Sequence, residues 1–228
     1  MRVLTIGDVH GCITALRTVT AAAGLGPDDL LVTLGDYVDR GPDSRAVLDW
    51  LIERPFGGEI VTLRGNHDVM MLDARADSDM LAGWLLCGGD ATLESYARQG
   101  GLDAWQAVSD EHWDFLKKTH RFYETETHIF VHATVHPKLD MKDQDDLALF
   151  WEKLSDPRPH RSGKTVICGH TAQHDGVPRA FSTPKHSAHT ICIDTWVYGD
   201  GWLTCLDIEE GRYWQGNEAG QTRSGQLF

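Results

Sequence analysis

Three short polar clusters in the first third of the chain contain residue types that bind cations and phosphate. They read Gly-Asp-Val-His-Gly at 7–11, Gly-Asp-Tyr-Val-Asp-Arg-Gly at 35–41 and Arg-Gly-Asn-His-Asp at 64–68. Each cluster follows an apolar run, and two single histidines follow similar runs later in the chain. The candidate ligands for two divalent cations are Asp8, His10, Asp36, Asn66, His132 and His170, with Asp39, Arg40 and His67 left over. Such a set is suited to the hydrolysis of a phosphate ester.

Two neighbouring cations can clamp both the attacking and the leaving oxygen of an in-line displacement at phosphorus. They need one bridging carboxylate, together with imidazoles and a neutral oxygen such as the amide of Asn66, so that ligand charge does not exceed that of the ions. Oxygen and imidazole ligands without thiolate favour Mn, Fe or Zn. A hydroxide that bridges the two ions is a nucleophile near neutral pH, so the pattern predicts direct attack without a covalent phosphoenzyme.

The elements that must position these residues alternate between strand and helix. The apolar patterns predict strands over 3–6, 30–34 and 59–63, with helices over 12–24 and about 44–53 between them. This order predicts parallel pairing with crossover helices. All three clusters come directly after a predicted strand. Ligands of open α/β sheets bind beyond the carboxyl ends of the strands, so the clusters are expected to meet in one pocket.

The remainder of the chain is predicted to be helical over about 67–120, including a helix over 110–118, and then to return to strands. Residues 198–202, Tyr-Gly-Asp-Gly-Trp, are predicted to form a hairpin turn. The polar stretch 136–162 is expected to flank the site irregularly, with a short helix near 145–153. The later strands are predicted over 128–131, 165–168, 190–193, 202–207 and near 212–214.

Length and composition favour one α/β domain over residues 1–228, because no linker, repeat or low-complexity tract divides the 228 residues. The net charge of −13 makes a nucleic-acid partner unexpected, since an acidic chain repels the phosphate backbone. No apolar run approaches the ~20 residues of a membrane span. The five widely spaced cysteines and the absence of a signal peptide predict reduced thiols and a cytoplasmic location.

The motifs GDVHG, GDYVDRGP and RGNHD, followed by VHA and GHT, resemble those of the calcineurin-like metallophosphoesterase superfamily. The VDRG form is similar to its phosphoprotein phosphatase branch, particularly the small bacterial and phage serine/threonine protein phosphatases. The resemblance covers about residues 7–206. It implies a four-layer α/β/β/α sandwich in which two mixed β-sheets are flanked by helices.

The resemblance also implies roles for residues at the matching positions. His67, oriented by Asp39, would protonate the leaving alkoxide, and Arg40 would grip the phosphate oxygens with its planar guanidinium. Arg64 and Lys153 are further candidate phosphate contacts. The implied ligands are Asp8 and His10 for the first metal, Asp36 as the bridge, and Asn66, His132 and His170 for the second, with Mn²⁺ as the expected ion.

Three departures from the family pattern leave substrate preference open. Lys153 stands where small members carry an arginine, Trp196 stands where they carry a glycine, and Thr134 follows the His-Ala pair. A lysine can neutralise phosphate charge, but it lacks the bidentate geometry of arginine.

Several assignments have an alternative. His136 competes with His132 as a ligand, and His174 competes with His170, although the strand-end position favours the earlier histidine in each case.

The basic residues also have structural alternatives. Arg40 could form an ion pair with Asp39 or Asp43, Arg64 could brace a loop, and Lys153 could be an ordinary surface residue.

The predicted activity is metal-dependent hydrolysis of a phosphomonoester, namely phosphoserine or phosphothreonine in a phosphoprotein, with phosphotyrosine and small aryl phosphates as additional substrates. One alternative is a symmetrical diadenosine tetraphosphate hydrolase, a subgroup that tends to lack the aspartate found here at Asp39. The other is a non-catalytic metal-binding interaction module, which would be expected to lack metal ligands or the acid His67.

Overall fold

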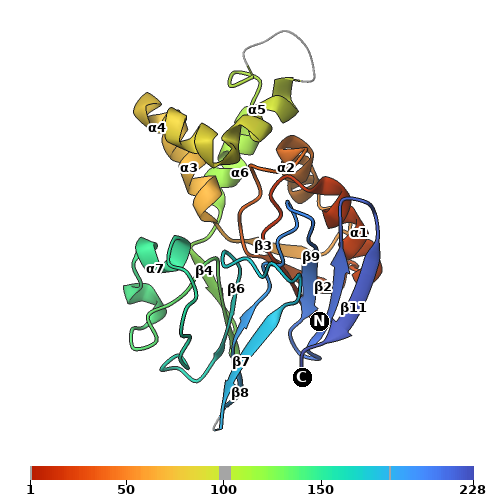
Figure 1. Ribbon diagram of the computed structural model, residues 1–228, viewed down its shortest axis with the longest axis vertical. Helices are drawn as coiled ribbons and strands as arrows, with labels where there is room; N and C mark the ends of the chain where they lie inside the picture. The colour runs from red at the N-terminus through yellow and green to blue at the C-terminus, as the bar shows by residue number, and fades with distance from the viewer. Residues whose placement is uncertain (1, 98–103, 185) are drawn as a thin grey trace.

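Two β-sheets pack face to face between helices in the computed structural model, which describes residues 2–97, 104–184 and 186–228 (Figure 1). The first sheet has the strand order β11-β10-β9-β1-β2-β3. Its strands β1, β2 and β3 are parallel, and β9 pairs antiparallel with β1. Their bounds are β1 (Arg2–Ile6), β2 (Asp29–Thr33), β3 (Glu59–Thr62), β9 (Leu203–Asp207), β10 (Arg212–Gly216) and β11 (Thr222–Gln226).

The second sheet has the order β4-β5-β6-β8-β7, and its three central strands β5, β6 and β8 are parallel. The edge strands β4 and β7 run antiparallel to their neighbours. Each sheet is therefore mixed, with a parallel set whose carboxyl ends face the same way. The bounds are β4 (Phe122–Glu124), β5 (His128–Val131), β6 (Thr165–Cys168), β7 (Arg179–Thr183) and β8 (His186–Cys192).

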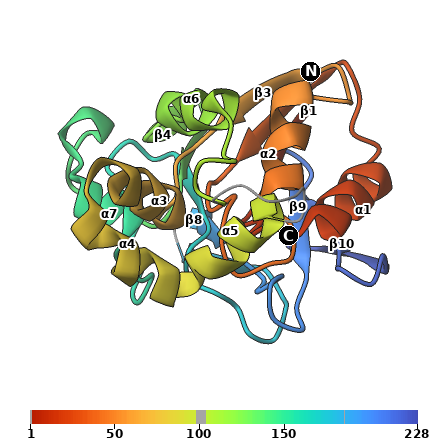
Figure 2. The ribbon, with the colours of Figure 1, turned by 90° about the horizontal axis from the view of Figure 1, so that it is seen from above.

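Helices cover both outer faces and the carboxyl ends of the strands. Helices α1 (Ile13–Ala23) and α2 (Ser44–Glu53) pack on the first sheet, and α7 (Asp146–Phe150), after the short 3₁₀ turn η2 (Met141–Asp143), lies beside the second (Figure 1). The helices above the strand ends are α3 (Asn66–Ala76), α4 (Ser78–Trp84), the π-helical η1 (Leu85–Gly89), α5 (Asp90–Ala97) and α6 (Asp110–Lys118), as Figure 2 shows from above. No helix in the described ranges is both long enough and apolar enough to cross a membrane.

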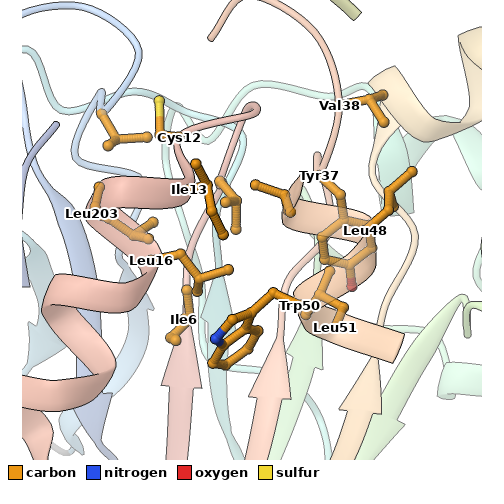
Figure 3. Close-up of a cluster of buried hydrophobic side chains, with 14 of the residues drawn as sticks. Ile6, Cys12, Ile13, Leu16, Tyr37, Val38, Leu48, Trp50, Leu51 and Leu203 are labelled. Atoms are coloured by element: carbon orange, nitrogen blue, oxygen red, sulfur yellow. The ribbon is translucent and has the colours of Figure 1, made fainter. Parts of the chain in front are cut away.

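Alternation along the strands explains the layers, because successive side chains of a strand point to opposite faces. Leu4 and Ile6 of β1 pack against α1 and α2, and Figure 3 shows Ile6 in this cluster, whereas Val3 packs between the sheets. In the second sheet, Phe130 of β5 faces the space between the sheets, and Ile129 and Val131 face α7 and η2. The predicted α/β/β/α sandwich of two mixed sheets is confirmed.

The hairpin predicted at residues 198–202 is wrong. Strand β8 lies in the second sheet and β9 in the first, so this segment carries the chain from one sheet to the other. Strands β4, β7 and β11 were not predicted. The first has three residues, and the other two carry mostly exposed or partly exposed side chains, so none has the buried apolar alternation that marks a strand in sequence.

Candidate dinuclear metal and phosphate site

The parallel strands of both sheets deliver the predicted residues to one place. Asp8 and His10 follow β1, Asp36 follows β2, and Asn66 and His67 begin α3 shortly after β3. From the second sheet, His132 follows β5 and His170 follows β6. A pocket of about 300 Å³ lies here, and its lining includes Asp8, His10, Asp36, Arg40, Asn66, His67, Lys153 and His170.

Asp36 stands at the centre of this pocket between two imidazoles. Its Oδ2 lies 3.5 Å from Nε2 of His10, and its Oδ1 lies 3.6 Å from Nε2 of His132. Ligand atoms of His10, Asp36 and His67 form one group within 4.8 Å of one another, and those of Asp36, His132 and His170 form a second. Asp36 is shared by the two groups, which is the position that a bridging carboxylate requires.

Backbone contacts fix which ring nitrogens face the pocket. Nδ1 of His10 donates to the carbonyl of Val38 at 3.0 Å, and Nδ1 of His132 donates to the carbonyl of Leu34 at 2.9 Å. Both imidazoles therefore present an unprotonated Nε2, as metal-binding histidines typically do when the other nitrogen is hydrogen bonded. His132 Nε2 also lies 3.0 Å from Oδ1 of Asn66, so the amide and this imidazole converge on one point.

His170, which follows β6 of the second sheet, presents its ring to the pocket in a different way. Its Nε2 donates to the carbonyl of Trp151 at 3.1 Å, which leaves Nδ1 as the unprotonated nitrogen. Its backbone N–H donates to both oxygens of Asp8, at 3.1 and 3.0 Å. This contact ties the loop after β1 to the loop after β6, so the two halves of the site are linked through Asp8.

Burial gives these groups the protonation states that suit cations. Burial lowers the pKa of His10 and of His132 well below the usual value, and it lowers the pKa of His170 to about 4, so all three imidazoles are neutral at neutral pH. Burial raises the pKa of Asp36 to about 7, and it raises the pKa of Asp8 well above its ordinary value. Neutral imidazoles beside crowded, desolvated carboxylates are an environment that a divalent cation stabilises, so the residues fit a metal centre.

The loops of the site hold an unusual backbone conformation. The described non-glycine residues with positive φ are His10, Asp36, Asp39, Arg40, Arg54, His170 and Trp196, and all except Arg54 lie at or beside the pocket. Such concentration of sparsely populated conformations is typical of functional sites. Gly65 and Gly169 allow close approach, because a Cβ at either position would overlap a side-chain oxygen of Asp36 or Asp8.

Asp68 connects the same loops through hydrogen bonds, although the sequence suggested no role for it. Its Oδ2 accepts from the N–H groups of Asp36 and Gly65, both at 2.9 Å, and its Oδ1 accepts from the N–H of Tyr37 at 3.0 Å. The carboxylate is fully buried. It therefore joins the loop after β2 to the start of α3, where Asn66 and His67 lie.

His67 and Asp39 form a buried pair at the edge of the pocket. Nδ1 of His67 lies 2.7 Å from Oδ2 of Asp39. Asp39 also accepts from Nε1 of Trp84 at 2.9 Å and from Oγ1 of Thr92 at 2.8 Å. Burial raises the pKa of Asp39 to about 7, while the donors from Thr92 and Trp84 oppose this, and burial lowers the pKa of His67. The two groups therefore compete for one proton.

Arg40 extends into the pocket without a carboxylate partner among the described residues, so the alternative ion pairs with Asp39 and Asp43 are absent there. Its Nη1 lies 3.3 Å from Nε2 of His10, and its Cζ lies 4.5 Å from the centroid of the Tyr198 ring. The free donors of its guanidinium are therefore available to an anion.

Lys153 and His174 also line the pocket. Nζ of Lys153 donates to the carbonyl of His170 at 2.8 Å, which holds the ammonium group at the pocket edge. The ring of His174 packs edge-on against Trp196 at 4.7 Å and belongs to neither candidate ligand group. His136 pairs with Asp145 at 3.4 Å and belongs to neither ligand group, whereas His132 belongs to the second, so the geometry favours His132.

The side chain of Arg64 points away from the pocket. Its side chain turns to the carboxyl end of α6, where it donates to the carbonyls of Leu116, Lys117 and Thr119 at 3.2, 2.8 and 3.3 Å. Nε also donates to Oγ1 of Thr119 at 2.9 Å. Arg64 therefore braces a helix end in this structure, because carbonyls left without partners at a helix end attract a cation, and its expected contact with phosphate stays a prediction.

Replacing Arg64 with alanine should therefore lower stability and leave catalysis nearly intact. We expect a loss of about 1–3 kcal/mol in the free energy of unfolding, since several hydrogen bonds from a charged donor are removed. The Michaelis constant for a phosphate ester should change less than about twofold. Urea denaturation and initial-rate measurements check both, with Arg40→Ala as the contrasting variant, in which substrate binding should weaken and stability should hold. A large rise in the Michaelis constant of Arg64→Ala would restore the phosphate-binding role.

The sequence analysis assigned no role to several residues that contact the site residues or line the pocket. Trp84 and Thr92 hold Asp39 from α4 and α5, Tyr198 contacts Arg40, and Asp194 lines the pocket as a further buried carboxylate. Asp68 had a signal, because it ends the third polar cluster. Asp194 also had one, because it directly follows a predicted strand, as the ligands do.

Residues 1–199 match the family described as calcineurin-like phosphoesterases. The chain belongs to this family. The family model describes phosphoesterases, and the two groups that share Asp36 are the candidate metal site of this chain.

Relatives within the calcineurin-like family differ in what they are named for. The chain is 44% identical to serine/threonine-protein phosphatase 1 of Salmonella typhimurium over 89 residues, 39% of each chain. It is 43% identical over 75 residues to the symmetrical bis(5'-nucleosyl)-tetraphosphatase of an Acidovorax species, 32% of this chain and 26% of the relative. These matches span less than half of either relative, so they leave the substrate open.

A solved structure supports the fold over the whole chain. It is that of a protein provisionally described as a diadenosine tetraphosphatase, and it superposes with a TM-score of 0.66 at 21% identity. The alignment covers 100% of this chain and 94% of the other. Likeness at this level of identity establishes the calcineurin-like fold and carries no information on substrate.

Proposed function

We propose that the protein is a phosphoprotein phosphatase that hydrolyses phosphoserine and phosphothreonine, with phosphotyrosine and aryl phosphates as further substrates. The observation that carries the proposal is the buried His67–Asp39 pair at the edge of the candidate metal pocket, with 2.7 Å between Nδ1 and Oδ2. The alkoxide of serine or threonine leaves poorly without a proton, so its hydrolysis needs a positioned acid. The partial similarity to a serine/threonine-protein phosphatase supports the same reading.

The proposed metal ligands are divided between the two sheets. Asp8 and His10 would hold one cation, and Asn66, His132 and His170 the other, with Asp36 between them. We propose Mn²⁺ as the ion, with Fe or Zn as the alternatives compatible with oxygen and imidazole ligands. When bound, such a pair neutralises phosphate charge and makes water nucleophilic near neutral pH.

The acid pair can work in either of two protonation states. If Asp39 holds the shared proton and donates it to Nδ1 of His67, then Nε2 carries a hydrogen. If His67 holds it, the ring is an imidazolium and Nε2 again carries a hydrogen. In both cases Nε2 can donate to a leaving alkoxide, and Trp84 and Thr92 keep Asp39 oriented throughout.

Arg40 and Lys153 supply the positive charge for the phosphate group. Arg40 offers several N–H donors in one plane, a geometry that matches two phosphate oxygens. Lys153 offers a point charge at the pocket lining, where its ammonium donates to the carbonyl of His170. Together they would orient the phosphate so that the leaving oxygen faces His67.

Hydrolysis of a dinucleoside tetraphosphate is the second candidate, favoured by the partial similarity to symmetrical tetraphosphatases. Cleavage of a phosphoanhydride releases a nucleoside diphosphate, which leaves as an anion without needing a proton. A buried acid pair then contributes little to the rate of cleavage. The His67–Asp39 contact therefore favours the monoester.

A rate panel tests the choice. A phosphoserine peptide, a phosphotyrosine peptide and diadenosine tetraphosphate should be compared by initial rates at equal concentration, with Mn²⁺, Zn²⁺ and Mg²⁺ added in turn to metal-free protein. We expect the highest kcat/KM on phosphopeptides with Mn²⁺. A tenfold preference for the dinucleotide would overturn the protein phosphatase assignment, and no turnover on any ester would overturn the enzymatic proposal itself.

A further inference from the structure

We infer that Tyr198 is a positioning residue that holds the guanidinium of Arg40 ready for phosphate, and this inference rests on the proposed function. Tyr198 lies in the segment that crosses from the second sheet to the first, and its ring contacts two residues of the site. The Arg40 guanidinium carbon lies 4.5 Å from the ring centroid, and the His10 ring meets it edge-on at 4.8 Å. Sequence patterns gave no indication of this contact, because they predicted a hairpin turn here.

Arg40 needs such a partner because its side chain is long and exposed. Its backbone is anchored, since the N–H donates to the carbonyl of Gly88 in η1 at 3.0 Å and φ is +69°. The rest of the side chain has rotamer freedom, and ordering a free arginine on phosphate carries an entropic penalty. Prior restraint of the guanidinium reduces that penalty at the moment of binding.

An aromatic face restrains an arginine in a way that suits an anion site. A carboxylate partner would occupy the N–H donors and cancel the charge. The ring of Tyr198 attracts the guanidinium through its π electrons and leaves the in-plane N–H groups and the positive charge available. Phosphate can then bind without first displacing a competing anion.

The contact with His10 cannot serve this purpose in the metal-loaded protein. Nη1 of Arg40 now lies 3.3 Å from Nε2 of His10, the nitrogen assigned to a cation. Once that nitrogen binds a metal, its lone pair no longer accepts from Arg40. Among the described residues, the ring of Tyr198 then still restrains the guanidinium.

The segment that carries Tyr198 is itself fixed. The N–H of Gly199 donates to the carbonyl of Trp196 at 3.1 Å, and the N–H of Trp202 donates to the carbonyl of Thr195 at 3.0 Å. Arg40 and Tyr198 also line both the metal pocket and a neighbouring cavity of about 400 Å³, so the stacked pair forms the wall between them. Without the ring, the guanidinium could swing into that cavity.

The experiment measures phosphate binding and turnover in Mn²⁺-loaded protein. Inorganic phosphate is the probe, titrated by calorimetry and as a competitive inhibitor of p-nitrophenyl phosphate hydrolysis. Tyr198→Leu should weaken phosphate binding and raise KM by roughly five- to thirtyfold, the range of a partly desolvated cation–π contact, with a smaller change in kcat. Tyr198→Phe should bind like the wild type, because it keeps the ring. Tyr198→Gln replaces the leucine variant if that one does not fold.

A double-mutant cycle separates positioning from general damage. In an Arg40→Ala background, Tyr198→Leu should have no further effect on phosphate affinity, because the two residues act as one unit. Trp214→Leu is the matched control, since Trp214 stacks with Arg212 at 4.8 Å away from the pocket, and it should leave phosphate affinity unchanged. Affinity for Mn²⁺ should also be unchanged in Tyr198→Leu.

The outcomes distinguish this inference from the proposed function. If the wild type hydrolyses esters but Tyr198→Leu binds phosphate equally well, the positioning role is wrong and the function stands. Additive effects in the cycle, or a matching loss of Mn²⁺ affinity, would also overturn it, since they would indicate that Tyr198 acts through His10 or through folding. If the wild type hydrolyses no phosphomonoester, the proposed function is wrong. The phosphate affinities measured by calorimetry then still test whether Tyr198 positions Arg40.

Discussion

Replacement of Asp36 by alanine should remove both cations and nearly all activity. Asp36 is the residue shared by the two candidate ligand groups, with its oxygens 3.5 and 3.6 Å from the facing nitrogens of His10 and His132. We expect Mn²⁺ affinity to fall by at least about 100-fold and turnover to fall on the order of 10³-fold or more, since several kcal/mol of charge stabilisation are lost. Calorimetric titration with Mn²⁺ and an ester assay measure the two effects.

Two further variants show whether the loss comes from the metal site. Asp36 Oδ1 also accepts from the N–H of His67 at 2.9 Å, so alanine could loosen the start of α3. Asp36→Asn keeps an acceptor there and removes the charge, and it should lose metal almost as completely. Asp207→Asn is the matched control, because that carboxylate is equally buried and caps a turn through Glu209 and Glu210 far from the pocket. Retention of two tightly bound ions in Asp36→Ala would refute the bridging role.

Replacement of His67 by alanine should slow hydrolysis according to the leaving group. For a phosphoserine peptide we expect a decrease of about 10²- to 10⁴-fold, the usual contribution of a positioned acid. For p-nitrophenyl phosphate, whose leaving group is stable as an anion, the decrease should be at least tenfold smaller. Initial rates on a series of alkyl and aryl phosphates measure this dependence. An equal decrease on every ester would argue against the acid role.

Metal stoichiometry decides between an acid and a ligand at this position. The group of His10, Asp36 and His67 is close enough for His67 to bind a cation itself. As the acid, His67→Ala should retain two Mn²⁺ per chain, whereas as a ligand it should lose one. His112→Ala is the control, because His112 is another buried histidine paired with an aspartate, Asp49, at 2.9 Å but lies outside the pocket. It should not alter the leaving-group dependence.

The fold was predicted well wherever the local pattern was strong. Apolar runs marked β1, β2, β3, β5 and β6, and the alternation with helices correctly predicted the parallel pairing of β1, β2 and β3. The edge strands β4, β7 and β11 were missed because they are short or mostly exposed, so no run of buried apolar side chains marks them in the sequence. The crossing at 198–202 was misread because a turn between strands looks the same in sequence whether the strands share a sheet or not.

The candidate site was likewise predicted from the sequence only in part. Asp8, His10, Asp36, Asn66, His132 and His170 could be collected from the sequence, because each closely follows a strand and parallel strands end at one edge. Arg64 also follows a strand, yet its long side chain turned to the end of α6, a partner 52 to 55 residues away in the chain. Where a flexible side chain points depends on which partner the fold places beside it.

The sequence by itself therefore determined the order of the elements and the residues delivered to the strand ends, since both follow from local periodicity and strand geometry. Only the tertiary structure decided the second layer of contacts, in which Asp68 joins two loops, Trp84 and Thr92 hold Asp39, and Tyr198 restrains Arg40. These contacts join residues from separate elements. No local pattern records them, because they form only when helices and sheets have packed at their final distances.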